Sequence, residues 1–268
     1  MKTILGVFLA LSALPSAAFA ASTDWIEQDG ARIRLVAAEP APDLAEIRAA
    51  LIVELKPGWK TYWRDPGDAG VPPQFSVTGG TNVTSARLDF PAPDRFEEGA
   101  AKSIGYKHPV SFPLTLALHT PGAPSVIKAS AFLGICEEIC VPVQLELSLD
   151  VPVAVGSTAD QGLVQAAFDA LPKEGNASFG LTDLAYQPKA LEIEISAPPS
   201  AQPPELFVAA DGFQFGTPKF TAALKEKSRY TVPIVFAPKT ARIEDTQVHY
   251  TIKSGGMAVA GAVPLRAN

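Results

Sequence analysis

The sequence predicts an all-β protein made of two β-sandwich domains that are joined by a short helical connector. Proline accounts for 25 of the 268 residues, and this high share disfavours long helices and favours short strands joined by turns. Apolar and polar residues alternate along most of the chain, which is typical of strands with one buried face. A single segment instead repeats its apolar residues with a helical period. The length suits one large domain or two small ones, since a domain commonly spans about 100–200 residues.

The first twenty residues have the pattern of a cleavable export signal. Lys2 supplies a positive charge, an apolar run covers 4–14, and residues 18–20 (Ala-Phe-Ala) are typical of a cleavage site. The apolar run is too short to cross about 30 Å of hydrocarbon, which disfavours an uncleaved membrane anchor. We therefore expect a signal peptide over 1–20, a mature chain without a membrane span, and an oxidising compartment in which cysteines can pair.

The first domain is expected over 21–154. Residues 47–55 place five apolar side chains on one face of a strand, although the segment 42–50 would also suit the start of a helix. Further strands are predicted over 126–133, where the residues are mainly apolar, and over 143–151, where apolar and polar residues alternate strictly.

A connector is expected over 155–175, because the apolar period changes there from two to that of a helix. Thr158 is suited to cap this helix, since Gln161 follows at the spacing of a capping box, and Pro172 ends it. The apolar residues that then share one helical face are Leu163, Val164, Ala167, Phe168 and Leu171.

The second domain, over 176–268, is predicted to be another β-sandwich. Short alternating segments recur there with Pro and Gly between them, which is typical of such folds. The predicted strands cover 191–195, 205–209, 229–236, 247–252 and 257–264. This domain carries no chemical motif, and we expect it to be a spacer or a docking surface.

The charge and the residue inventory exclude several function classes. The net charge of −6 disfavours a nucleic-acid binder, because nothing in the balance neutralises phosphates. The sequence lacks the motifs of a serine hydrolase, a phosphate-binding loop and a zinc protease. The three histidines, at 108, 119 and 249, do not have metal-ligand spacing. We therefore expect neither a cofactor nor a metal.

The strongest chemical motif is the cysteine pair in the segment 134–142, where three residues separate Cys136 from Cys140. A disulfide across so small a loop contributes only roughly 2 kcal/mol by the chain-entropy estimate, which favours redox use over a structural role. A structural pair remains the alternative. Glu137 and Glu138 disfavour the thiolate, and no cation is adjacent in sequence. A thiol pair that exchanges only with a docked partner is therefore favoured over a free-standing oxidant.

An aromatic and Pro/Gly-rich cluster over 57–73 precedes the cysteines. Trp59, Trp63 and Arg64 are candidates for a partner-binding surface, with burial of the two tryptophans in the sandwich as the alternative. A third stretch contains Phe90-Pro-Ala-Pro-Asp-Arg-Phe96, then Gly105-Tyr106, then Phe112-Pro113.

These three motifs, in this order, resemble the periplasmic N-terminal domain of the thiol:disulfide interchange protein DsbD, in its copper-tolerance-associated ScsB-like variant. The resemblance covers about 25–153 with specific motifs and 176–268 by layout alone. It implies immunoglobulin-like sandwiches and a cysteine pair, Cys136 and Cys140, that is followed by Pro142. It also implies that the segment from Phe96 to Tyr106 caps the disulfide and that Tyr62 forms the wall beside it.

We therefore expect a soluble periplasmic protein that relays electrons from a membrane-embedded thiol reductase to thioredoxin-like proteins, with Cys140 facing the downstream partner. Full-length members of the family continue into a transmembrane bundle and a thioredoxin-like domain, so the reductase is expected to be a separate protein. The alternative is a non-catalytic interaction module with a structural disulfide. A copper-handling role, suggested by the family association, would use the reduced thiols as soft ligands.

Overall fold

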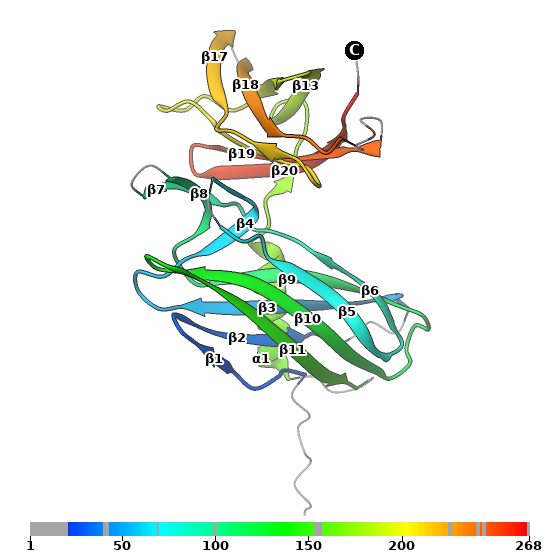
Figure 1. The fold of residues 1–268 in the computed structure, drawn as a ribbon. Coiled ribbons are helices and arrows are strands. Elements are labelled where there is room, and N and C mark those ends of the chain that lie inside the picture. Colours follow the sequence, from blue (N-terminus) through cyan, green and yellow to red (C-terminus); the bar gives the residue numbers. More distant parts are fainter. Residues whose placement is uncertain are drawn as a thin grey trace, which may run out of the picture.

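The fold consists of two β-sandwiches, the second above the first in the view of Figure 1, with a small third sheet between them. The computed structural model describes residues 21–39, 43–68, 70–98, 101–152, 157–224, 227–239, 242 and 245–266. The all-β, immunoglobulin-like class is confirmed, while the predicted signal segment 1–20 lies outside the described residues. No helix in the described ranges is long and apolar enough to cross a membrane.

The first sandwich packs a five-stranded sheet against a three-stranded one. The larger sheet has the order β1 (Ile26–Gln28), β2 (Ala31–Ala37), β3 (Glu46–Leu55), β9 (Val110–Leu118), β6 (Val83–Leu88). The smaller has the order β11 (Cys140–Val151), β10 (Ser125–Cys136), β5 (Gln74–Thr81). The strands predicted over 47–55, 126–133 and 143–151 lie within β3, β10 and β11, so the helical alternative for 42–50 is excluded at least from Glu46 onward.

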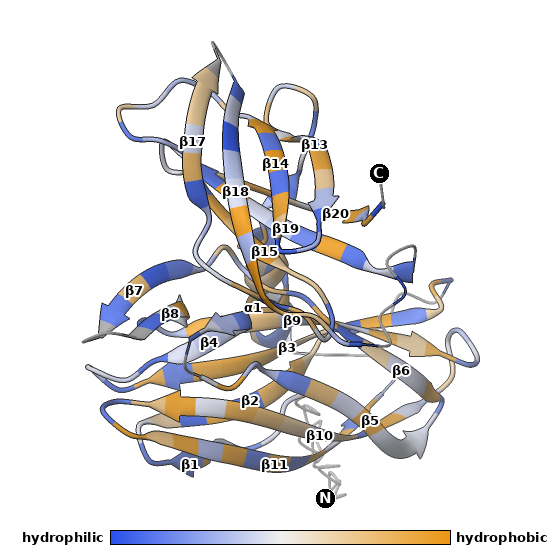
Figure 2. Ribbon diagram, turned by 45° about the horizontal axis from the view of Figure 1, so that its top comes forward, coloured by the Kyte–Doolittle hydropathy of each residue, from blue (hydrophilic) through white to orange (hydrophobic). Residues whose placement is uncertain are grey.

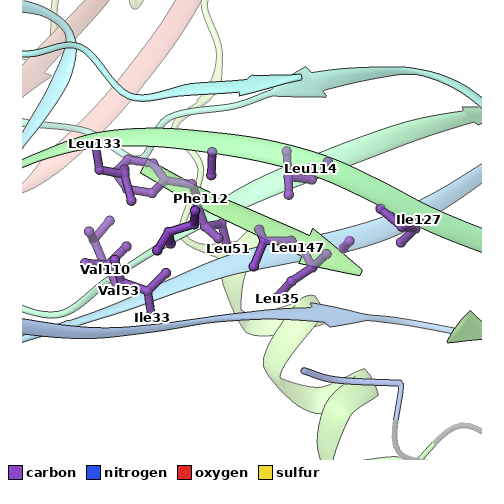
Figure 3. Packing of buried hydrophobic residues seen from close by; sticks show 14 of the residues in the cluster. Ile33, Leu35, Leu51, Val53, Val110, Phe112, Leu114, Ile127, Leu133 and Leu147 are labelled. Atoms are coloured by element: carbon purple, nitrogen blue, oxygen red, sulfur yellow. The ribbon is translucent and has the colours of Figure 1, made fainter. Parts of the chain in front are cut away.

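The core of this sandwich follows from the alternation seen in the sequence. From Val143 to Val151 on β11 every second residue is buried, and the residues between are exposed. The hydropathy colours alternate along β10 and β11 in the same way (Figure 2). Phe112, Leu51 and Leu133 from the two facing sheets meet in the interior and are completely buried (Figure 3). Removal of these apolar side chains from water is the main force that stabilises the sandwich.

The helix α1 (Thr158–Asp169) packs on the outer face of the larger sheet instead of bridging open space between the domains. Val164 and Ala167 are buried there against Ile52 and its neighbours. One prediction about this helix is wrong in detail: Ser157, not Thr158, is the N-cap residue. Leu163 is 37% exposed, because the sheet contacts only the narrower stripe of the helix that contains Val164 and Ala167.

The small sheet lies at one end of the first sandwich, beneath the second (Figures 1 and 2). Its order is β4 (Thr61–Gly67), β8 (Ala101–Tyr106), β7 (Asp94–Glu98). Gly105 has to be glycine here, because a Cβ atom would lie 2.1 Å from the carbonyl oxygen of Thr61 on the paired strand. The absence of a side chain at Gly105 allows β4 and β8 to approach closely.

The second sandwich also has two sheets. One has the order β12 (Lys173–Glu174), β20 (Met257–Pro264), β19 (Gln247–Ser254), β15 (Glu205–Ala209). The other has the order β13 (Gly180–Gln187), β14 (Ala190–Ser196), β18 (Lys227–Phe236), β16 (Gln214–Phe215), with β17 (Lys219–Leu224) also pairing with β18. All five strands predicted for this part of the chain are confirmed.

The second sandwich contacts the small sheet directly. The guanidinium of Arg95 on β7 donates to the carbonyl oxygen of Leu206 on β15 at 2.9 Å. The ammonium of Lys253 on β19 donates to the carbonyl oxygen of Pro93 at 3.1 Å and pairs with Asp94. The two sandwiches are therefore joined by specific contacts and not only by the connector.

Asp65 is a buried carboxylate in this joint, 8% exposed. It accepts a hydrogen bond from the backbone N–H of Gly67 at 3.1 Å and lines a small cavity together with Phe215 of the second sandwich. Burial nevertheless raises its pKa above the ordinary value of 3.8, since desolvation outweighs the favourable effect of the nearby backbone N–H groups and of Arg95. The folded state thus binds the proton up to a higher pH than the unfolded state does. The contribution of Asp65 to stability therefore falls as the pH rises from about 3.8 through the folded pKa.

We expect Asp65→Asn to gain stability relative to the unchanged chain as the pH rises from about 3.5 to about 7, because Asn keeps an acceptor oxygen without a buried charge. Urea denaturation of both proteins across this range measures the difference. Asp150→Asn, on the exposed face of β11, is the matched control for the loss of one carboxylate. A difference that moves against the Asp65 variant with rising pH would show that the attraction of Arg95 dominates.

Candidate functional site

The two cysteines form a disulfide at the tip of the β10–β11 hairpin. Cys136 is the last residue of β10, Cys140 is the first of β11, and the two face each other in the strand register. Both strands are thus slightly longer than predicted and end at the sulfurs. Only the three residues 137–139 lie in the turn.

The two sulfur-bearing residues differ in their access to solvent. Cys136 is completely buried, whereas Cys140 is exposed. Ile139 next to it is 78% exposed, the largest exposed fraction among the large apolar residues that the structure describes. The hairpin tip therefore presents one cysteine and an apolar side chain outward, while the other cysteine is held inside.

Tyr62 on β4 contacts both sulfurs. Its hydroxyl donates to Cys136 Sγ at 3.0 Å and lies 3.1 Å from Cys140 Sγ. The Tyr62 side chain is 1% exposed. The wall residue implied by the family resemblance therefore lies against the disulfide.

Two glycines make room for the Tyr62 ring. A Cβ atom at Gly70 would lie 2.5 Å from Tyr62 Cε1, and one at Gly134 would lie 3.2 Å from Tyr62 Cδ2. Gly70 also has a φ of +147°, a conformation that other residues rarely adopt. The Pro/Gly-rich segment after Tyr62 thus shapes the pocket for this ring.

Lys60 is a residue that the sequence reasoning missed. Its backbone exchanges two hydrogen bonds with Cys136, at 2.8 and 3.0 Å, so it pins the end of β10 to the start of β4. Its ammonium is almost fully buried and donates to the carbonyl oxygen of Glu137 at 2.9 Å. A cation is therefore present at the hairpin tip in space, although none is adjacent in sequence. Only the strand pairing reveals it.

The segment expected to cap the disulfide is the β7–β8 hairpin, with residues 99 and 100 outside the described part. Phe96 is half-buried, and the ammonium of Lys107 lies 4.6 Å from the centre of its ring. Tyr106 is a core residue: its hydroxyl donates to the carbonyl oxygen of Pro91 at 2.8 Å, and its ring packs edge-on against Phe112. Pro142 is exposed on β11. In the part of the chain that the structure describes, the side chain given a hydrogen-bond contact with the two sulfurs is that of Tyr62.

The three candidates for a partner surface do not form one exposed surface, although the guanidinium carbon of Arg64 lies 5.9 Å from the centre of the Trp63 ring. Trp63 is 1% exposed and packs edge-on against Phe207 of the second sandwich, so it is not part of a surface. Trp59 is half-buried over the turn at Gly30. Arg64 is half-buried over the ring of Phe90, at 4.7 Å, and burial lowers its pKa. The burial alternative is correct for Trp63, because the second sandwich covers that position.

The candidate site thus consists of a disulfide, a tyrosine hydroxyl and a buried lysine. In the ranges that the structure describes, no group of three His, Cys, Asp or Glu side chains is placed to hold a metal. The arrangement suits thiol–disulfide exchange, since one sulfur is accessible and a hydroxyl donor lies beside both.

Comparisons with known proteins point to the same chemistry. Residues 32–152 match the model of the family described as thiol:disulfide interchange protein DsbD, N-terminal, and this range contains both cysteines and Tyr62. Among the solved structures that match is the N-terminal periplasmic domain of ScsB from Proteus mirabilis. The TM-score is 0.71 at 22% identity, over 93% of this chain and 100% of that one, so the similarity in fold includes the second sandwich. No curated protein matches the chain.

Proposed function

Because residues 32–152 form a DsbD N-terminal-like domain, we propose that the chain is a periplasmic thiol:disulfide interchange protein. In this proposal, the Cys136–Cys140 pair relays electrons from a separate membrane-embedded thiol reductase to thioredoxin-like proteins. The active unit is the first domain, 21–154, and the connector, 155–175, leads to the second domain, 176–268. The export pattern of residues 1–20 and the periplasmic origin of the similar ScsB domain support the compartment.

The observation that carries the proposal is the position of the disulfide. It closes a hairpin whose strands are already paired along their whole length, from Ser125 with Val151 to Cys136 with Cys140. A bridge there excludes few conformations of the unfolded chain and stabilises the fold little. A reactive pair at an accessible tip explains its place better than a structural bridge does.

The asymmetry of the pair suits two-step exchange. In the reduced protein, the exposed Cys140 thiolate attacks the partner disulfide, forms a mixed disulfide and displaces one partner thiolate. The Cys136 thiolate then attacks Cys140 Sγ, which restores the Cys136–Cys140 disulfide and releases the second partner thiolate. The partner gains two electrons and two protons, and the chain loses the same number. The reductase returns them by the reverse sequence.

The test is redox equilibration of the chain from Ala21 in graded dithiothreitol or glutathione buffers. Free thiols are counted with an alkylating agent that shifts the mass. A midpoint between about −180 and −270 mV, the range of exchanging dithiols, is expected. A midpoint well below about −300 mV would mark a structural bridge and would favour the non-catalytic interaction module.

A further inference from the structure

The strand β15 belongs to two cores at once. Phe207 and Ala209 are buried in the cluster that forms the core of the first sandwich. Leu206 and Val208 point the other way, into the core of the second sandwich. Since successive side chains of a strand alternate between its faces, one strand of the second domain completes the interior of the first.

Phe207 is the residue that makes this contact. Its side chain is completely buried, and its ring centre lies 6.1 Å from that of Trp63 in an edge-on arrangement. The guanidinium carbon of Arg95 lies 4.8 Å from the centre of the same ring. Phe207 thus fills the space between β4, which carries Trp63, and β7, which carries Arg95.

The same strand β4 carries the residue that contacts the sulfurs. Tyr62 and Trp63 are neighbours in the chain, both 1% exposed, and they lie on opposite faces of β4. Tyr62 is directed at the disulfide and Trp63 at Phe207. A shift of β4 toward a space left by Phe207 would therefore move the Tyr62 hydroxyl away from the sulfurs.

Contacts hold the two edges of the small sheet against the second domain. On the side of β4, the ring of Trp63 packs edge-on against Phe207. On the side of β7, Arg95 donates to the carbonyl oxygen of Leu206, and Lys253 donates to that of Pro93. The small sheet is therefore fixed between the second domain and the disulfide (Figure 1).

We propose that Phe207 is a positioning residue for thiol–disulfide exchange, and that the second domain serves to hold Tyr62 in hydrogen-bond contact with the Cys136–Cys140 pair. This inference rests on the proposed function of that pair. It assigns to the second domain a role in the reactivity of a site that lies entirely in the first.

The expected effect follows from the hydrogen bond. A bond from the Tyr62 hydroxyl to sulfur strengthens as the sulfur becomes a leaving thiolate, so it accelerates reduction. Tyr62→Phe keeps the ring and removes the donor, and we expect dithiothreitol to reduce its disulfide roughly threefold to tenfold more slowly. Phe207→Ala is expected to slow reduction in the same direction. Reduction of the disulfide in the double variant is expected to be no slower than in Tyr62→Phe alone, because both changes remove the same hydrogen bond.

The experiment measures the rate of reduction by dithiothreitol for the chain from Ala21 and its variants, at a temperature at which circular dichroism shows all of them folded. Val232→Ala is the matched control, since Val232 is completely buried in the core of the second domain alone. It should leave the rate unchanged. Phe207→Leu retains much of the side-chain volume, so its disulfide should be reduced at a rate close to that of the unchanged chain. If Phe207→Ala does not fold, the smaller decrease in rate expected for Phe207→Leu tests the inference in its place.

Several results would overturn the inference. These are an unchanged or faster rate in a folded Phe207 variant, additive effects in the double variant, and equal slowing by Val232→Ala. Each leaves the proposed function standing, because that function is tested separately by the midpoint potential. Conversely, a midpoint well below about −300 mV would reject the relay while leaving the coupling of Phe207 to Tyr62 measurable.

Discussion

The Cys136→Ala variant is expected to accumulate a mixed disulfide with an oxidised thioredoxin-like protein, whereas Cys140→Ala should form roughly tenfold less. The reason is access. Cys140 is exposed at the hairpin tip, while Cys136 is completely buried behind Tyr62. With Cys136 removed, Cys140 can still attack the partner, but no second thiol remains to resolve the product. In both single variants, turnover should be abolished.

The measurement is a time course of the mixed disulfide on non-reducing gels after acid quenching, with a purified periplasmic thioredoxin-like protein as the partner. The chain with both cysteines changed to Ser is the control for non-covalent association. Melting curves check that each variant is folded, and only a small loss is expected because the bridge spans four residues. Stronger trapping by Cys140→Ala would reverse the assigned order of attack, and equal trapping by the two single variants would show that neither cysteine is preferred.

The clearest of the strands predicted from the sequence have one exposed and one buried face, whereas β1, β2 and β4–β9 were not predicted. The alternation over 143–151 corresponds to the buried and exposed residues of β11. The predicted strand 257–264 coincides with β20. Where a strand faces a core on one side and solvent on the other, the residue types at every second position indicate which face is buried.

The joint between the domains was not predicted, because it depends on contacts between segments far apart in the chain. A signal for it was nevertheless present. Residues 206–210 form a continuous apolar run, Leu-Phe-Val-Ala-Ala, and such a run is typical of a strand buried on both faces. The second cover of this strand is the small sheet of the first domain, and no local pattern identifies which surface that is.

The site was predictable only in part, because some of its residues are brought together by contacts between distant segments of the chain. The cysteine spacing pointed to the chemistry, and the family resemblance pointed to Tyr62. Lys60 reaches the hairpin tip only through its pairing with Cys136, which is a tertiary contact. Trp63 was expected at a surface or in the sandwich, and the second domain decides between these by covering it. Residues whose role depends on the neighbouring domain therefore escape local reasoning.

Phe112→Ala is expected to reduce the free energy of unfolding by roughly 3–5 kcal/mol, the largest stability effect of any change considered. Phe112 is completely buried on β9, between the two facing sheets (Figure 3). Its ring packs edge-on against Phe90 and Tyr106, with centroid distances of 5.5 Å in both cases. Alanine leaves a cavity that the rigid sheets around it cannot fill. Urea denaturation followed by circular dichroism measures the loss.

Two variants sharpen this measurement. Phe236→Ala removes the same ring at a position that is 56% exposed, and it should change stability by less than about 0.5 kcal/mol. Phe112→Leu should fall between Phe112→Ala and the unchanged chain. A loss below about 1 kcal/mol for Phe112→Ala would contradict the placement of this ring at the centre of a packed core.

The same denaturation curves show whether the two sandwiches unfold together. Phe207 of the second domain belongs to the buried cluster that contains Phe112. Loosening that cluster therefore removes the surface on which β15 rests. We expect Phe112→Ala to lower the midpoint of a single transition, since a strand that is shared between two cores couples their unfolding. Two separate unfolding transitions, one of which keeps its midpoint in Phe112→Ala, would show that the second domain is stable without the first.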